Sequence, residues 1–127
     1  MRRTDQRRAA VVALYQADLT HRSLGDLLPR EATQFTRELA EGVLREQEQI
    51  DALIERYAED WTLDRIAPLE RSILRVSLFE LLYRDDIPHE VAIDEAVETA
   101  KELCGADAPG FVNGILGAVQ REEVKPA

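Results

Sequence analysis

The N-terminal segment of the chain concentrates side chains that can contact a nucleic acid. Its basic residues are Arg2, Arg3, Arg7 and Arg8, and Tyr15 and Gln16 follow in the same predicted helix. Arginine suits phosphate because its planar guanidinium donates two parallel hydrogen bonds and stays charged. A tyrosine ring can stack on a base, and a glutamine amide can hydrogen-bond a base edge. This combination predicts a small footprint for single-stranded RNA, although Tyr15 taken alone also fits a half-buried core position.

The charge of this segment is opposite to that of the chain as a whole. The formal net charge is −9, whereas residues 1–30 contain six arginines against three aspartates. An acidic protein repels nucleic acid at long range, so any phosphate contact has to come from a local basic patch. Arginines in the first turn of a helix also oppose the helix dipole. A solvated helix start remains the alternative interpretation, and charge alone does not separate the two.

The other candidates for chemistry form no catalytic or metal-binding set in the sequence. His21 and His89 are isolated, Cys104 is the single cysteine, and no glycine-rich phosphate loop or nucleophile elbow occurs. Cys104 falls on an apolar helical stripe and is interpreted as a small core residue. Carboxylate pairs such as Asp85–Asp86 are typical of a solvated helix face. The sequence therefore predicts a binding protein without a metal or a cofactor.

The composition also indicates the cellular compartment in which the protein is expected. No run of 18 apolar residues is present, so no transmembrane helix is expected. The N-terminal arginines are not followed by the apolar segment of a signal peptide. A lone cysteine suits a reducing compartment. Together these features predict a cytoplasmic protein that makes no membrane contact.

The hydrophobic pattern predicts an all-α fold. Ala, Glu, Leu and Arg dominate, and no sustained alternation of apolar and polar residues occurs. We expect helices over about 4–19, 31–59, 68–83, 88–104 and 111–122, followed by a tail at 124–127. Thr4 or Asp5 is expected to cap the first helix, and Gly105 to stand at the C′ position after the fourth. The polar residues 45–49 leave open a break in the second helix. The third is apolar nearly all round and is placed at the centre.

Three stretches carry more information than a helical pattern. They are RRAAVVALYQAD at 7–18, WTLDRIAPLERSILRVSLFELLY at 61–83, and DIPHEVAIDEAVETAKELCGADAPGFVNGIL at 86–116. Together they resemble the NusB family of bacterial transcription antitermination factors. The resemblance implies two small helical bundles packed into one domain over residues 1–127, with halves of about 1–60 and 61–122. It also implies that the protein has no enzymatic activity.

The resemblance further implies a function in transcription. Family members bind the boxA segment of nascent RNA together with NusE, a small-subunit ribosomal protein, in an antitermination complex with RNA polymerase. The complex lets the polymerase pass terminators, notably in ribosomal RNA operons, and supports ribosomal RNA maturation. The arginine-rich N-terminus is similar to the family's RNA-binding element. Phosphate contacts are accordingly expected from its four arginines, with Tyr15 beside them.

The resemblance places further candidate residues in the second half of the chain. Arg75, the Asp107 loop, Phe111 and Asn113 would complete the RNA surface. Phe111 could stack on a base and Asn113 could read a base edge. The alternatives are a core anchor for Phe111, a helix-terminus hydrogen bond for Asn113 and an ion pair for Arg75. Glu70 and Glu80 are candidates for facing the basic NusE.

The sequence departs from the family pattern at two places. Asp94 replaces the usual asparagine, and Ala108-Pro109-Gly110 replaces the usual serine and lysine before FVNG. Both changes are expected to weaken RNA binding. Two other functions remain open: a protein-only adaptor whose acidic surface binds a basic partner, and a detached RNA-binding domain related to ribosomal RNA cytosine methyltransferases. The methyltransferase would require a long Gly-rich catalytic domain beyond residue 127. The sequence leaves open whether the protein is a monomer or a homo-oligomer.

Overall fold

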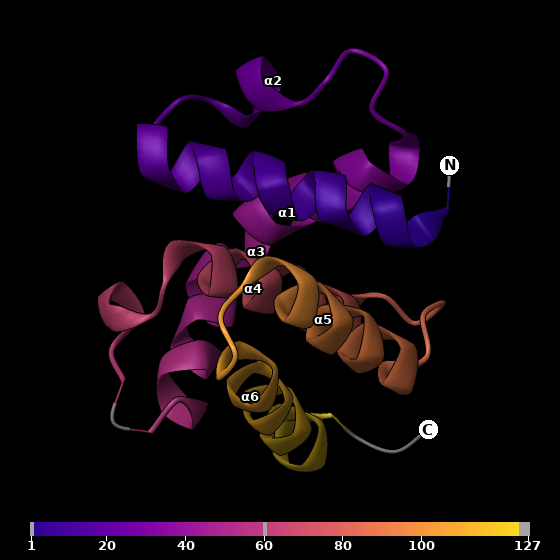
Figure 1. Cartoon of the computed structure of the whole chain (residues 1–127). Helices are drawn as coiled ribbons and strands as arrows, with labels where there is room; N and C mark the ends of the chain where they lie inside the picture. The colour runs from indigo at the N-terminus through magenta and orange to yellow at the C-terminus, as the bar shows by residue number, and fades with distance from the viewer. Residues whose placement is uncertain (1, 60, 125–127) are drawn as a thin grey trace.

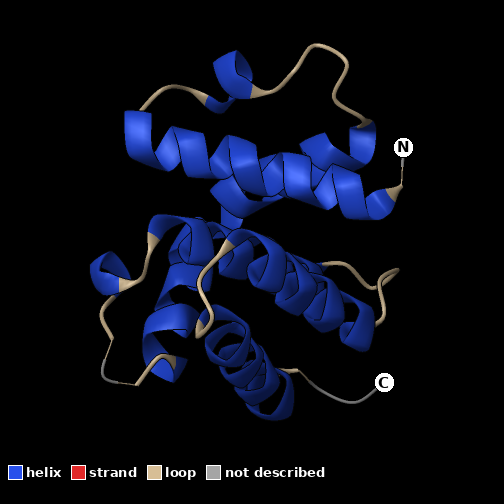
Figure 2. Ribbon diagram, in the orientation of Figure 1, coloured by secondary structure: helices blue, strands red, loops and turns tan. Residues whose placement is uncertain are grey.

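A computed structural model describes residues 2–59 and 61–124, and all regular structure in these ranges is helical (Figures 1 and 2). The all-α expectation is confirmed. The expected tail at 124–127 lies outside the described residues from 125 onward. The elements in chain order are α1 (Arg3–Thr20), α2 (Leu24–Leu27), α3 (Gln34–Tyr57), the 3₁₀ helix η1 (Leu63–Arg65), α4 (Pro68–Tyr83), α5 (His89–Leu103) and α6 (Ala108–Glu123).

Local sequence signals explain where α3 and α4 begin. Thr33 caps α3, because its hydroxyl oxygen accepts a hydrogen bond from the backbone N–H of Thr36 at 3.2 Å. Pro68 occupies the first turn of α4, where its missing N–H leaves no helical hydrogen bond unmade. α3 runs through the polar residues 45–49 without a break. Val43 and Ile50, on either side of these residues, are fully buried.

The expected start of the first helix is wrong, whereas the expected position of Gly105 after α5 is confirmed. α1 starts at Arg3, before both expected cap residues, with Arg2 at the N-cap position and no side-chain cap. The hydroxyl of Thr4, an expected cap of this helix, instead donates to Glu95 on α5 at 2.8 Å. Gly105 follows the C-cap residue Cys104 and so stands at the C′ position, as expected. The helix ends at Cys104 in an extended conformation, and Gly105 has no positive φ, because the chain turns directly towards α6.

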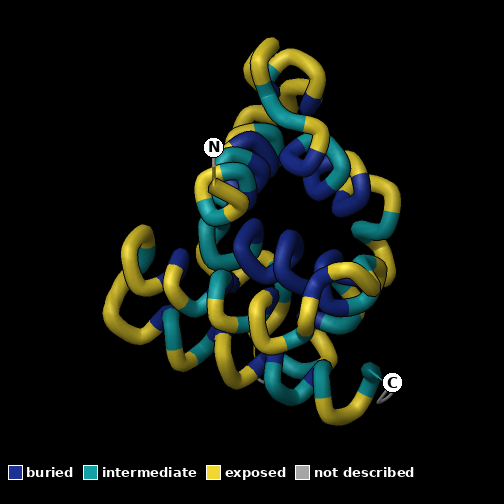
Figure 3. The backbone as a smooth tube through the Cα atoms, turned by 90° about the vertical axis from the view of Figure 1, so that its right-hand side faces the viewer, coloured by how far each residue is buried: buried dark blue, intermediate teal, exposed yellow. Residues whose placement is uncertain are grey.

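α4 lies at the centre of the molecule, as its apolar sequence predicts. It packs against α1, α3, α5 and α6. All of its residues from Ser72 to Leu81 are buried. In Figure 1, α1 and α2 cover one side of this centre, α5 and α6 cover the other, and α3 passes from one side to the other. Figure 3 shows the buried segments turned towards the interior. The arginine-bearing helix α1 is thus fixed on the core through α3 and α4.

Candidate nucleic-acid interface

Two arginines at the start of α1 reach the surface. The Arg2 side chain is 82% exposed and lies 3.6 Å from Asp5, a distance at which an exposed ion pair adds little stability. Arg3 is also exposed, and its guanidinium carbon lies 4.1 Å from the centre of the Phe35 ring on α3. This cation–π contact fixes the direction of Arg3 while leaving its N–H groups able to reach a ligand.

Arg7 is buried and does not reach the surface. Its Nε donates to both carboxylate oxygens of Glu80 on α4, at 2.9 and 3.0 Å, and its Nη1 lies 3.8 Å from Glu95 on α5. Burial raises the pKa of the Glu80 carboxyl, and the Arg7 guanidinium opposes that shift. The structure therefore corrects two expectations. Neither the phosphate contact of Arg7 nor the partner contact of Glu80 is accessible, because each side chain neutralises the other inside the core.

The exposure of Arg8 is intermediate between that of Arg2 and that of Arg7. Its side chain is 25% exposed, and its Nη1 donates to Glu102 on α5 at 2.6 Å. This hydrogen bond lowers the pKa of the Glu102 carboxyl and raises the pKa of Arg8. The Nε of Arg8 is buried and has no hydrogen-bond partner among the described residues. Arg8 can therefore donate to a phosphate at the edge of α1, in competition with Glu102.

A hollow of about 590 Å³ separates the start of α1 from α5. Arg2, Thr4 and Arg8 line it on one side. The α5 side is mostly acidic, with Val91, Asp94, Glu95, Glu98 and Glu102. A phosphate in this hollow would meet four carboxylates, so the favourable approach is along the Arg2–Arg3 side of α1. Asp94, which departs from the family pattern, stands among the unfavourable charges.

Arg75 forms an ion pair, which is the alternative to RNA contact that the sequence left open for it. It is buried on α4, and its guanidinium donates to both oxygens of Asp51 on α3, at 2.8 and 2.9 Å. Its Nη1 also lies 3.4 Å from Asp18 on α1. A bidentate arginine–carboxylate pair of this kind is strong and geometrically specific. Arg75 therefore links three helices, and little of its side chain reaches the surface.

The remaining candidate residues differ in exposure. Gln16, Asp107 and Asn113 are exposed, whereas Tyr15 and Phe111 are half-buried. Phe111 packs against the core, which supports its alternative role as an anchor. Glu70 is half-buried, and its carboxyl pKa is raised by burial and by the nearby Asp107. The structure thus brings Glu70 and Asp107 together as two like charges near the start of α6.

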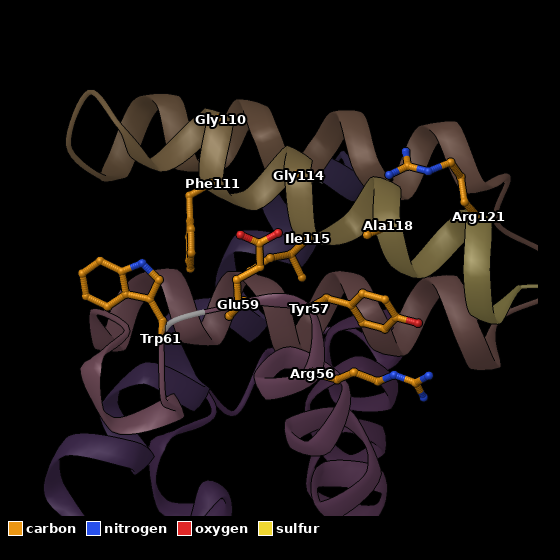
Figure 4. A pocket seen from close by; sticks show the side chains of 11 residues that line it. Arg56, Tyr57, Glu59, Trp61, Gly110, Phe111, Gly114, Ile115, Ala118 and Arg121 are labelled. Carbon is orange, nitrogen blue, oxygen red and sulfur yellow. The ribbon is translucent and has the colours of Figure 1, made fainter.

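Residues that the sequence did not single out surround Phe111. A hollow of about 460 Å³ lies between the end of α3 and α6, and Figure 4 shows its lining. Trp61, 49% exposed, and Phe111 lie at one end, and Arg56 and Arg121 at the other. One feature of the sequence could have indicated this hollow. The single tryptophan, Trp61, follows the helix expected over 31–59, so its apolar ring is not part of that helix.

Other kinds of site find no support in the described part of the chain. No group of three or more His, Cys, Asp and Glu side chains among the described residues is placed to hold a metal ion. Within the same ranges, no helix combines the length and the apolar character needed to cross a membrane. Cys104 is half-buried, and burial raises the pKa of its thiol.

Comparison with known proteins identifies the family of the chain. The model of the NusB family matches residues 4–121 of the chain. The chain belongs to the NusB family. Transcription antitermination protein NusB of Leifsonia xyli subsp. xyli is 40% identical over 133 aligned residues, which cover 95% of this chain and 92% of that protein. The protein of the same name from Frankia casuarinae is 51% identical over 87 residues, which are 68% of this chain and 64% of its own length.

Solved structures of NusB proteins have the same fold. A crystal form of T. maritima NusB superposes with a TM-score of 0.90 and 34% identity, covering 98% of this chain and 94% of that chain. A chain in the crystal structure of the antitermination factors NusB and NusE in complex with dsRNA gives a TM-score of 0.84 and 26% identity. That match covers 94% of this chain and 96% of the other.

Proposed function

We propose that this NusB-family chain is a transcription antitermination factor that binds boxA-type single-stranded RNA together with NusE. In this role it promotes processive transcription of ribosomal RNA operons and supports ribosomal RNA maturation. The observation that carries the proposal is the close match, over 94% of the chain, to a chain of a NusB–NusE–dsRNA complex. The protein acts by binding, without enzymatic activity, in the cytoplasm.

The arginines of α1 have different roles in RNA binding. Arg2, Arg3 and Arg8 donate to phosphates, since Arg2 and Arg3 are exposed and the Arg8 side chain is 25% exposed. Arg7 acts indirectly: its pair with Glu80 on α4 sets the rotation of α1 and therefore the direction of the other three. Gln16 and Asn113 are exposed amides that can read base edges, and Tyr15 offers part of a ring for stacking. Arg75 contributes by linking α1, α3 and α4 through Asp18 and Asp51.

The same surface predicts weak RNA binding by the protein alone. The carboxylates of α5 compete with RNA for Arg2 and Arg8, and the net charge of −9 repels the RNA backbone. A basic partner such as NusE neutralises part of this charge and adds contacts of its own. RNA affinity is therefore expected to rise when NusE is present.

The test measures fluorescence anisotropy of labelled boxA RNA and of a scrambled RNA, with and without NusE, at two salt concentrations. The variant Arg2→Ala/Arg8→Ala is compared with Arg22→Ala/Arg30→Ala, which removes two exposed arginines from the α1–α3 connection. We expect selective boxA binding that strengthens with NusE, falls with salt and weakens about 10-fold in the first variant only. Equal affinity in the two variants would contradict the assignment of α1.

The acidic hollow between α1 and α5 favours a second function, a protein-only adaptor. Its four carboxylates are suited to a basic protein partner. An adaptor would bind NusE with the same affinity whether or not RNA is present, and it would show no boxA selectivity at either salt concentration. The anisotropy experiment with a NusE titration separates the two functions.

A further inference from the structure

The ring of Phe35 gathers three arginine side chains. Phe35 is the second residue of α3 and is 7% exposed. The guanidinium carbon of Arg3 lies 4.1 Å from the ring centre, and those of Arg7 and Arg84 lie 5.3 and 5.4 Å from it. All three are within the range of about 6 Å over which a ring face attracts a cation. The arrangement therefore couples a core residue of α3 to the basic start of α1.

Two of the three arginines are neutralised by carboxylates. Arg7 is paired with Glu80 in the core. Arg84, which follows α4, donates to both carboxylate oxygens of Asp86 and to Glu38, each at 2.9 Å. The side chains of Arg7 and Arg84 are 7% and 17% exposed, so little of either reaches the surface. Neither is therefore well placed to donate to RNA.

Arg3 is the member of this group whose donors are not used inside the protein. It is exposed, and its guanidinium makes no hydrogen bond or ion pair with the described residues. Its charge does reach the Asp86 carboxyl: the hydrogen bond from Arg84 lowers the pKa of this group to about 2, and Arg3 adds to the lowering. The contact that orients Arg3 is therefore the one with the Phe35 ring.

The start of α3 is hydrogen-bonded to α1, which fixes the ring beside Arg3. The hydroxyl of Thr33 donates to the side-chain oxygen of Gln6 at 2.6 Å. The hydroxyl of Thr36 donates to the backbone oxygen of Gln6 at 2.9 Å. Thr33 and Thr36 stand on either side of Phe35 in the chain, so the ring cannot shift relative to α1 without breaking these bonds.

A cation–π contact can orient an arginine without occupying its donors. A guanidinium that lies flat on a ring keeps its N–H groups in its own plane, where a phosphate can approach them. Ordering a long side chain on binding lowers the affinity by about 2- to 13-fold. A ring that orders the side chain beforehand removes this cost, because a larger fraction of the free protein is already competent to bind.

We propose that Phe35 is a positioning residue for RNA binding, whose ring holds the Arg3 guanidinium in the orientation that receives a phosphate. The ring acts through Arg3 and does not itself touch RNA, since it is buried. This inference rests on the proposed RNA-binding function and adds to it an apolar residue of α3, outside the arginine-rich segment. The competing explanation is that Phe35 is a core residue only, because it also belongs to the hydrophobic core.

Fluorinated phenylalanines at position 35 test the attraction of the ring for the cation. Each added fluorine draws electron density from the ring face and weakens the attraction, while the ring keeps nearly the same size. Chains with a mono-, di- or trifluorinated phenylalanine in place of Phe35 are compared by anisotropy of labelled boxA RNA in the presence of NusE. We expect the RNA affinity to fall stepwise, by about 2- to 5-fold in total, which is the size of an exposed cation–π contact.

Arg3→Ala decides whether the ring acts through Arg3. In this background the fluorinated series should leave the RNA affinity unchanged, because the side chain that the ring orients is absent. Arg2→Ala is the matched control. Arg2 is exposed next to Arg3 and is not among the arginines that lie over the Phe35 ring. The fluorinated series should keep its full effect in the Arg2→Ala chain.

Phe35→Leu separates positioning from a structural role. It removes the ring, so the Tm should fall, as it should in Phe79→Leu, which removes another buried ring. Below the Tm of both variants, Phe35→Leu alone is expected to weaken boxA binding, by about 2- to 13-fold. Its affinity should keep the salt dependence of the natural chain, because Arg3 still reaches a phosphate in the complex. Arg3→Ala should instead reduce the salt slope by about 0.7.

The outcomes are distinguishable from a failure of the proposed function. Equal RNA affinity across the fluorinated series, with Arg3→Ala still weakening binding, would overturn the inference and leave Arg3 standing as an RNA contact. An equal effect of the series with and without Arg3, or equal weakening by Phe35→Leu and Phe79→Leu, would assign Phe35 to the core alone and would also overturn it. Absence of boxA binding, or unchanged affinity in Arg3→Ala, would contradict the role of α1 in the proposed function, and this inference with it.

Discussion

Neighbouring arginines on α1 have different physical roles. Arg7 is buried in a pair with Glu80, whereas Arg8 sits at the edge of the helix and shares its charge with Glu102. One residue corresponds to a rotation of about 100° on a helix, which is enough to move a side chain from the core to the surface. The position of each arginine on the helix therefore decides whether it contacts RNA or positions those that do.

Replacement of Arg7 should destabilise the protein in a pH-dependent way. Burial raises the pKa of Glu80 above its ordinary value of 4.5, and Arg7 opposes this shift. A carboxyl whose pKa is raised on folding contributes most stability at low pH, and that contribution is lost as the pH rises through the folded pKa. Without Arg7 the pKa of Glu80 rises further, so the loss extends towards neutral pH.

The measurement is urea denaturation of Arg7→Met and of the natural chain between about pH 4.5 and pH 7.5. At pH 7 the variant should be less stable by about 3–5 kcal/mol, the usual consequence of leaving a buried charge unpaired. The difference should shrink as the pH falls and Glu80 becomes neutral. Arg2→Met is the control, because Arg2 is exposed, and it should change stability by less than about 0.5 kcal/mol. A deficit of Arg7→Met that is independent of pH would contradict this account.

Asp94 is expected to limit RNA affinity. It lines the hollow that contains Arg2 and Arg8, and its charge opposes a phosphate there. An exposed charge interaction amounts to about 0.2–1 kcal/mol, so Asp94→Asn should tighten boxA binding by about 1.4- to 5-fold. Anisotropy of labelled RNA at low salt measures the change. Asp26→Asn on α2 removes the same charge away from this hollow, and equal gains in the two variants would point to net charge alone.

Helix positions could be predicted well from the sequence, while contacts between helices could not. The apolar series along α4 and the proline at its start indicate both its bounds and its central place. The sequence contains no comparable signal that Glu80 on α4 pairs with Arg7, which lies 73 residues away. The same limit applies to Trp61 and Arg121, which line the same hollow only because α6 folds back onto α3. The hydrophobic periodicity of the sequence describes each helix separately. A site depends on which faces of different helices pack against each other, and the periodicity does not contain that information.

The closeness of α3 and α4 depends on a single glycine. A Cβ at Gly42 would lie 2.1 Å from Cζ of Phe79, whose side chain is 4% exposed. The ring stacks on Tyr83 at a centroid distance of 5.6 Å and cannot move aside freely. Gly42→Ala is therefore expected to destabilise the protein by at least about 1–3 kcal/mol, even though alanine favours a helix.

A double-mutant cycle measures this helix–helix contact. Phe79→Leu alone should also be destabilising, because it leaves space beside Gly42. The methyl group that Gly42→Ala introduces can fill part of that space, so Gly42→Ala/Phe79→Leu should be more stable than the sum of the two single changes predicts. Chemical denaturation of the four proteins gives the coupling free energy. Additive effects would show that α3 and α4 can separate slightly to accept the extra methyl group.

The whole molecule places a small basic surface on an acidic body. Its net charge of −9 destabilises the compact state through self-repulsion, and the same charge repels RNA. The pairs that fix α1 on α4, namely Arg7–Glu80 and Arg75–Asp18, are largely buried and weakly screened by salt. Salt therefore acts mainly on the surface charges. It weakens their mutual repulsion and their attraction for phosphate at the same time.

Salt should thus change stability and RNA affinity in opposite directions. Between about 20 and 200 mM NaCl the Tm is expected to rise, since the shorter Debye length screens the repulsion among the exposed carboxylates. Over the same range the RNA affinity should fall by about 0.7 log units per log of salt for each phosphate contact, or about 2 in total for Arg2, Arg3 and Arg8. The variant lacking all three arginines should keep the rise in Tm and lose most of this slope. A slope that is unchanged in that variant would place the phosphate contacts elsewhere on the molecule, with the arginines of the α3–α6 hollow as the next to be replaced.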